Sequence, residues 1–70
     1  MKTVKIKDEF IKLDQFLKFV GIVGTGGESK AMIKSEMVKV NGSTTTERGK
    51  KLRSGDLIEL EDHDEKYTIE

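Results

Sequence analysis

The chain of 70 residues contains no cysteine, so no disulfide, zinc–thiolate site or iron–sulfur cluster can hold its fold together. A chain of this length buries only about 60% of the surface that its unfolded form exposes. Hydrophobic residues make up 34% of the chain and charged residues 37%. We therefore expect one domain over residues 1–70 with a thin hydrophobic core and no enclosed catalytic cleft.

The hydrophobic pattern changes its period along the chain and thereby predicts two helices. Residues 13–20 place apolar side chains at i, i+3, i+4 and i+7, which indicates a short helix that ends at Gly21. Residues 25–28 read Thr-Gly-Gly-Glu, which fits a capping box in which Thr25 and Glu28 satisfy each other's backbone N–H groups. This second helix is expected to run to about Met37.

Alternating segments on either side of the helices predict short strands. Residues 2–7 alternate, and so do residues 38–40, which lead into Asn41-Gly42, the strongest two-residue hairpin signal. A returning strand is expected over 44–46, and further strands over 57–60 and 66–70, the last of them beside the N-terminal strand. The predicted fold is α+β, with two short packed helices on a small, mostly antiparallel sheet.

The residue types available exclude most catalytic chemistry. His63 is the only histidine and lies in an acidic turn, residues 61–65, so it has no partners for a metal cage or a catalytic triad. A Walker loop needs lysine after its second glycine, and Gly27 stands in that place. We expect no enzyme activity, no cofactor and no metal site.

No apolar run approaches the roughly 18 residues that a membrane span requires, and the N-terminus lacks the apolar core of a signal peptide. We therefore expect a soluble, cytoplasmic protein that does not bind membranes and is a monomer.

The net charge of zero hides an uneven distribution. Residues 1–53 carry 12 Lys and Arg against 6 Asp and Glu, whereas residues 54–70 carry 1 against 7. A basic body with an acidic C-terminal segment fits a protein that presents one positive face to a polyanion.

The positions of the basic residues suggest where that face lies. Lys12 and Lys18 are expected on the polar side of the first helix, and Lys30 and Lys34 share one face of the second. Arg48, Lys50, Lys51 and Arg53 form a tight group in a predicted loop. The bare N–H groups at Gly26 and Gly27 either bind one phosphate or form a turn without a ligand, and the sequence leaves both open. The residues predicted to contact a sugar–phosphate backbone are Lys12, Lys18, Thr25, Gly26, Gly27, Lys30, Lys34, Arg48, Lys50 and Lys51.

The stretch from Lys12 to Leu60, 49 of the 70 residues, resembles the RNA-binding domain named after ribosomal protein S-four, also called the alpha-L motif. The family pattern is Arg-Leu-Asp-x2-Leu, glycine, Ser-Arg, Val-x-Val-Asn-Gly and Gly-Asp-x-Ile. This chain has, in the same order, Lys12-Leu13-Asp14, Leu17, Gly21, Thr25-Gly26, Val38-Lys39-Val40-Asn41-Gly42 and Gly55-Asp56-Leu57-Ile58. It looks most like the short stand-alone bacterial members termed YaaA-like.

The resemblance implies RNA binding without catalysis, since in the family's enzymes the domain delivers RNA and performs no chemistry. The chain departs from the pattern at three positions. Lys12 and Gly26 stand where the family has arginine, and Glu36 stands where it has glycine. Lys12 keeps the charge but lacks the planar fork of arginine, and Gly26 has no side chain to offer a phosphate.

The sequence thus predicts a non-catalytic domain that docks on structured RNA, ribosomal or transfer RNA, through a basic surface of helices and loop. The alternative is a protein–protein interaction module that uses the same face or the acidic C-terminal segment.

Overall fold

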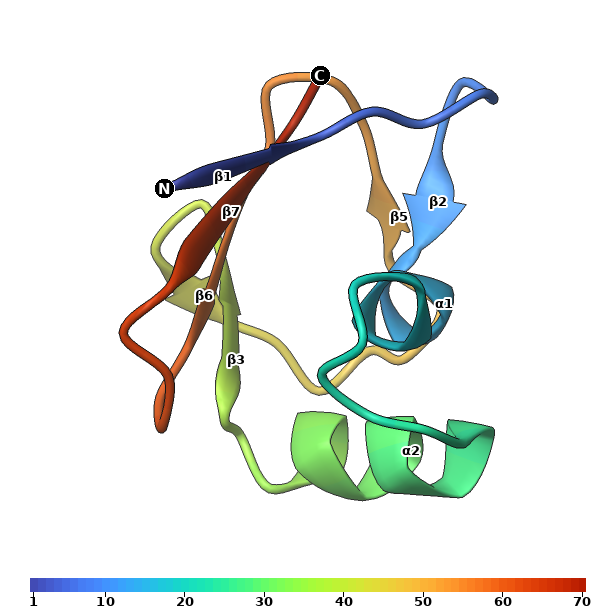
Figure 1. The fold of residues 1–70 in the computed structure, drawn as a ribbon. Helices are drawn as coiled ribbons and strands as arrows, with labels where there is room; N and C mark the ends of the chain where they lie inside the picture. The colour runs from blue at the N-terminus through green and yellow to red at the C-terminus, as the bar shows by residue number, and fades with distance from the viewer.

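A five-stranded sheet and two helices enclose the hydrophobic core in the computed structural model, which describes residues 1–70 (Figure 1). The molecule measures 26 × 21 × 19 Å along its principal axes. Its elements are β1 (Lys2–Val4), β2 (Ile11–Lys12), α1 (Leu13–Phe19), α2 (Gly26–Lys34), β3 (Val38–Val40), β4 (Ser43–Thr44), β5 (Lys51–Leu52), β6 (Leu57–Leu60) and β7 (Lys66–Ile69).

The main sheet has the strand order β1-β7-β6-β3-β4, and β2 and β5 form a separate two-stranded ribbon. Every pair is antiparallel except β1 and β7, which run parallel with Lys2 opposite Tyr67 and Val4 opposite Ile69. The expected α+β class with a mostly antiparallel sheet is confirmed, and so is the expectation that the last strand lies beside the first.

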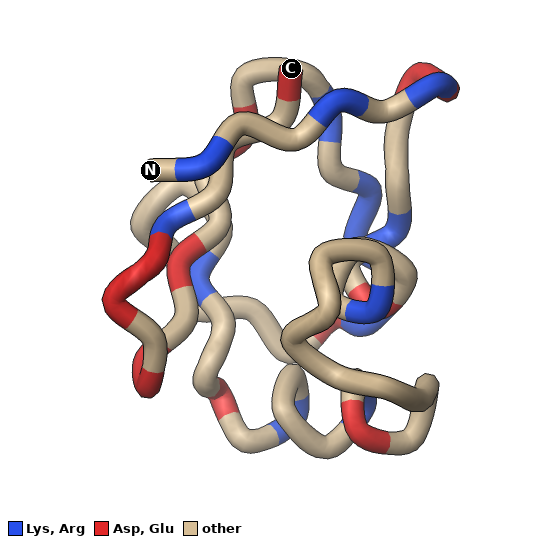
Figure 2. Tube along the Cα trace, in the orientation of Figure 1, with Lys and Arg blue, Asp and Glu red and all other residues tan.

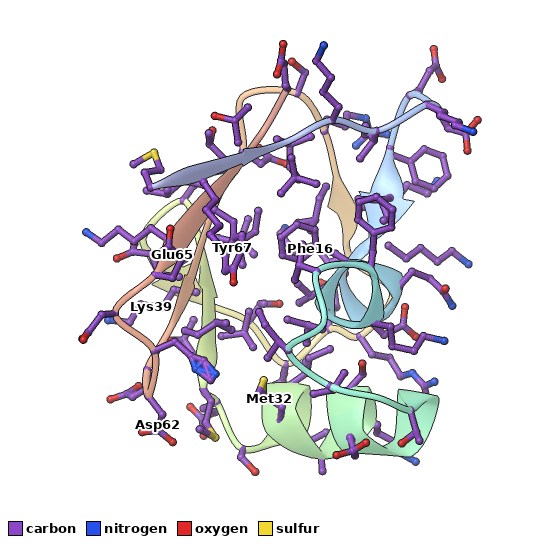
Figure 3. All side chains as sticks on the ribbon, in the orientation of Figure 1. Phe16, Met32, Lys39, Asp62, Glu65 and Tyr67 are labelled. Atoms are coloured by element: carbon purple, nitrogen blue, oxygen red, sulfur yellow. The ribbon has the colours of Figure 1, made fainter.

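Twelve buried hydrophobic side chains from both layers form one core cluster. The sheet presents alternate residues to it, as a period of two requires, and α1 contributes the predicted stripe of Leu13, Phe16 and Leu17. The rings of Phe16 and Tyr67 meet edge to face with centroids 5.7 Å apart and join α1 to the sheet (Figure 3). The full cluster is Val4, Leu13, Phe16, Leu17, Ile33, Val38, Val40, Leu52, Ile58, Leu60, Tyr67 and Ile69.

The Asn41-Gly42 hairpin forms as predicted, although its returning strand is displaced by one residue. Asn41 and Gly42 have φ angles of 53° and 86°, which is the signature of a type I′ turn. A two-residue turn returns the chain to the ladder at once, so β4 begins at Ser43 and the expectation of a strand over 44–46 was wrong.

Two other predicted boundaries were too long. The first strand ends at Val4 and does not reach residue 7, because its partner β7 ends at Ile69; the N–H of Glu70 then donates to the carbonyl of Val4 at 2.9 Å. The helix expected to reach Met37 ends at Lys34.

Both helices end in the same way, with one residue in the left-handed region. After α1 that residue is Gly21, with φ 81°, and after α2 it is Glu36, with φ 61°. In each case the N–H groups of this residue and of the one after it donate to carbonyls of the last turn in a Schellman motif; for α2, Glu36 donates to Ile33 and Met37 to Met32. Glu36 thus has the conformation that glycine adopts without strain, at the position where the family pattern has glycine.

Glu36→Gly should raise the free energy of unfolding by about 1 kcal/mol, because glycine lacks the Cβ that strains the left-handed conformation. Gly21→Ala should lower it by a similar amount through backbone strain alone, since no atom lies within 4 Å of the added Cβ. Urea unfolding measures both changes.

Glu36→Gln is the matched control for the loss of charge and should leave stability nearly unchanged. A gain from Glu36→Gln equal to that from Glu36→Gly would show that charge, and not backbone strain, is the cause.

Candidate nucleic-acid interface

The start of α1 is held by main-chain atoms from a distant loop. The residue before the helix, Lys12, makes no side-chain cap. Instead the N–H of Leu13 donates to the carbonyl of Lys50 at 2.8 Å, and that of Asp14 donates to the carbonyl of Arg48 at 3.0 Å. The unpaired N–H groups of a helix start must find acceptors, and here loop 48–50 supplies two of them. The basic loop is therefore fixed to the helix.

The β2–β5 ribbon brings further basic residues to the same place. Ile11 pairs with Leu52 and Lys12 with Lys51. Lys12 thus lies on a strand and not on the helix as expected, and Lys51 lies on a strand and not in a loop. Each strand has only two residues, too few to show an alternating pattern.

Arg48 is anchored by an ion pair. Its Nε–H donates to Asp14 Oδ2 at 3.3 Å, and the carboxylate is only 13% exposed whereas Arg48 is 48% exposed. One of the five guanidinium N–H groups is used, so the exposed remainder of the group keeps donors for a phosphate.

The start of α2 forms the predicted capping box with one difference. Thr25 Oγ1 accepts the N–H of Glu28 at 3.2 Å, as expected. The Glu28 carboxylate accepts from the N–H of Gly24 at 3.1 Å and from the Thr25 hydroxyl, and not from the N–H of Thr25. A carboxylate therefore already lies at this helix start, where the helix dipole favours negative charge. It competes with any phosphate at Gly26 and Gly27.

A buried serine joins the two helices. Ser29 is fully buried, and its hydroxyl donates to the carbonyl of Asp14 at 3.0 Å. This bond brings the first turn of α2 against the start of α1. Ser29 was not predicted to be a structural residue, although its spacing of four from the buried Ile33 places both on one face of α2.

The structure therefore brings some of the predicted residues together and leaves others apart. We define the basic cluster as Lys12, Arg48, Lys50 and Lys51, which surround the start of α1. Lys18 lies half-buried in the last turn of α1, and Lys30 and Lys34 are exposed one turn apart on α2. Figure 2 shows basic segments along β2 and β5 and on the adjoining α1.

The acidic turn lies on the other side of the molecule. The segment between β6 and β7, with Asp62 and Glu65, projects from the sheet away from β2 and β5 (Figures 2 and 3). Glu65 meets the N-terminal amino group at 3.7 Å, and Lys66 meets Glu59 at 3.5 Å. Two of the acids at this end thus pair with basic groups outside the basic cluster.

A surface hollow of about 230 Å³ lies over β3 and β6, lined by Lys39, Glu59, Leu60 and Glu61. It is separate from the basic cluster. Neither helix is long and apolar enough to cross a bilayer.

Three comparisons relate the chain to known proteins. The family model described as S4 domain matches residues 4–70. The chain is 38% identical over 58 residues to the probable ribosome maturation protein RlbA of Bacillus subtilis (strain 168). These residues make up 83% of this chain and 82% of that protein. The crystal structure of 30S ribosomal protein S4e from Thermoplasma acidophilum matches with a TM-score of 0.63 at 24% identity. The match covers 89% of this chain and 32% of that one, so this chain spans about a third of its length and the likeness concerns the fold alone.

The contact between the helices leads to a second prediction. Ser29→Ala should lower the free energy of unfolding by about 1 kcal/mol, because it removes a buried hydrogen bond between α1 and α2.

Ser35→Ala is the matched control. The Ser35 hydroxyl also donates to a carbonyl, that of Ala31 at 2.8 Å, but Ser35 directly follows α2, so this bond joins no second element and is exposed to water. Its loss should change stability by less than about 0.5 kcal/mol. Equal effects of the two substitutions in thermal or urea unfolding would contradict the structural role of Ser29.

Proposed function

Because the chain belongs to the S4 domain family, we propose that it is a non-catalytic RNA-binding domain that docks as a monomer on structured RNA through the basic cluster. One similar protein is named as a probable ribosome maturation protein, and the similar structure is that of a ribosomal protein. We therefore propose ribosomal RNA as the partner, with transfer RNA as the competitor that an assay should include.

The observation that carries this proposal is the attachment of loop 48–50 to the start of α1. The bonds from Leu13 and Asp14 to the carbonyls of Lys50 and Arg48 fix the loop backbone, and the ladder between Lys12 and Lys51 fixes the strands beside it. The four cationic side chains of the basic cluster therefore extend from backbone segments that are hydrogen-bonded to one another. A polyanion that neutralises such a group releases its counterions, which is the main source of sequence-independent affinity for nucleic acids.

The contacts available on this surface are to phosphates more than to bases. Lysine is a point charge that binds phosphate from many directions, whereas Arg48 offers a planar fork. Contacts of this kind position a protein on RNA and carry no sequence information by themselves. We propose that recognition rests on the shape of folded RNA, as is general for double-stranded RNA.

The helices extend the proposed surface beyond the basic cluster. Lys18 on α1 and Lys30 and Lys34 on α2 add cations on the two helices, which the hydrogen bond from Ser29 to Asp14 joins. Thr25, Gly26 and Gly27 would contribute a hydroxyl and backbone donors. The Glu28 carboxylate opposes a phosphate there, so we assign the helix start a smaller share of the affinity than the basic cluster.

The salt dependence of binding tests this assignment. Lys12→Gln combined with Lys50→Gln should make the negative slope of log affinity against log salt concentration shallower by about 1.5, since two phosphate contacts are lost. The control is Lys2→Gln combined with Lys39→Gln, which removes the same charge from β1 and β3 in the sheet. It should change the slope by much less. Equal losses in both double variants would show that net charge matters and that the basic cluster does not.

The α2 lysines are tested separately. Lys30→Glu combined with Lys34→Glu should weaken binding at least tenfold if both contact RNA, because each contact is lost and two repulsive charges are added. Unchanged affinity in a folded variant would remove α2 from the surface. If the wild-type chain does not bind ribosomal RNA even at low salt, the proposal fails, and the alternative of a protein-interaction module is favoured.

A further inference from the structure

The outer face of the β2–β5 ribbon carries a group of side chains that extends beyond the basic cluster. Ile11 and Leu52 pair across the ribbon and face inward, with Leu52 fully buried and Ile11 packed against the core. Neighbouring residues of an extended chain point to the opposite face. Lys12 and Lys51, one position along, therefore point outward, and the same register places Phe10 opposite Arg53.

The contacts of Phe10 confirm this arrangement. Lys51 Nζ lies over the Phe10 ring at 4.8 Å from its centroid, and the Arg53 guanidinium carbon lies over it at 5.8 Å. Both distances are within the range of cation–π attraction. Phe10 is half-buried but is not among the residues packed against the core. Its ring thus contacts cations on the surface and does not fill the interior.

The cations on this face lack anionic partners. The molecule has three ion pairs, and none of them includes Lys12, Lys51 or Arg53. The nearest acid in the chain after Arg53 is Asp56, whose two oxygens already accept from the Asn41 amide and the Arg53 backbone N–H. Like charges on adjacent side chains repel one another, and a ring that attracts both keeps them in one place. An anion at the Phe10 ring would meet donors from Lys51 and Arg53, and Lys12 lies beside Lys51 on the same outward side of the ribbon.

We propose that this outer face is a binding site for the phosphates of one RNA strand, in which Arg53 joins Lys12 and Lys51 as a contact residue and Phe10 is the positioning residue that holds Lys51 and Arg53. The inference rests on the proposed function and adds two residues to it, Phe10 and Arg53. Lys51 and Arg53 lie over the ring, so a stacking nucleobase would have to displace them. The geometry therefore favours phosphate over a base as the group bound here.

A double-mutant cycle tests the role of Phe10. The affinity for purified bacterial ribosomal RNA is measured at low salt for the wild type, Phe10→Leu, Lys51→Gln with Arg53→Gln, and the triple variant. Phe10→Leu should weaken binding about three- to fivefold in the wild-type background, the equivalent of one exposed cation–π contact. It should have almost no effect once Lys51 and Arg53 are neutral. Phe10→Tyr keeps the ring face and should bind like the wild type.

Any other result of the cycle contradicts either the role of Phe10 or the binding of RNA. If Phe10→Leu weakens binding equally in both backgrounds, or Phe10→Tyr weakens it as much, Phe10 acts on its own and is not a positioning residue. If the wild type binds and Phe10→Leu has no effect, the inference fails while the proposed function stands. If the wild type does not bind, both fail.

The charge variant provides a test that does not depend on changing the ring. Lys51→Gln with Arg53→Gln should make the negative slope of log affinity against log salt concentration shallower by about 1.5. An unchanged slope would overturn the site even if Phe10→Leu did not fold, and the unfolding transition of each variant shows whether it folds.

Discussion

Two carbonyl groups, those of Arg48 and Lys50, cap a helix that has no cap of its own. Helix α1 has seven residues, and isolated helices of that length do not persist in water. Its first N–H groups are satisfied from across the fold, its third by the carboxylate of Asp14, and its apolar side is buried in the core. The segment that carries the cations is thus also part of what keeps the helix folded. Its backbone contributes to the stability of the helix, while Lys50 and the unpaired N–H groups of Arg48 keep donors for a ligand.

The elements that local signals specify were predictable. The stripe of α1, the Thr25 cap and the Asn41-Gly42 turn each depend on residues within a few positions of one another. The β2–β5 ribbon was not predictable, because two residues per strand show no period and the partners are some forty positions apart. The error in the predicted end of α2, at Met37 and not at Lys34, has a different cause. Glu36 has an ordinary propensity for helix, and it adopts the left-handed conformation as part of the Schellman motif in which Glu36 and Met37 donate to Ile33 and Met32.

The candidate site was predictable in its charges and not in its geometry. Uneven charge and the family resemblance identified most of the cationic residues, yet Lys12 was assigned to the wrong element and Arg53 was left out of the set. Phe10 carries no charge and was not among the predicted residues. A signal was present in the spacing, since Phe10 and Lys12, like Lys51 and Arg53, are two positions apart and so share one side of an extended segment. Joining the two pairs required knowing that the segments meet.

The parallel pairing of β1 with β7 joins residues 2–4 to residues 67–69, nearly the greatest separation that the chain allows. Contacts of this kind form late, since the entropy of closing the loop between them must be overcome first. During synthesis β1 has no partner until β7 has been made, and β6 likewise lacks its neighbour on that side. The helices, the hairpin and the β2–β5 ribbon are complete earlier. The basic cluster therefore depends on residues 12–51 alone, whereas the sheet on the opposite side closes only when residues 66–69 join residues 2–4.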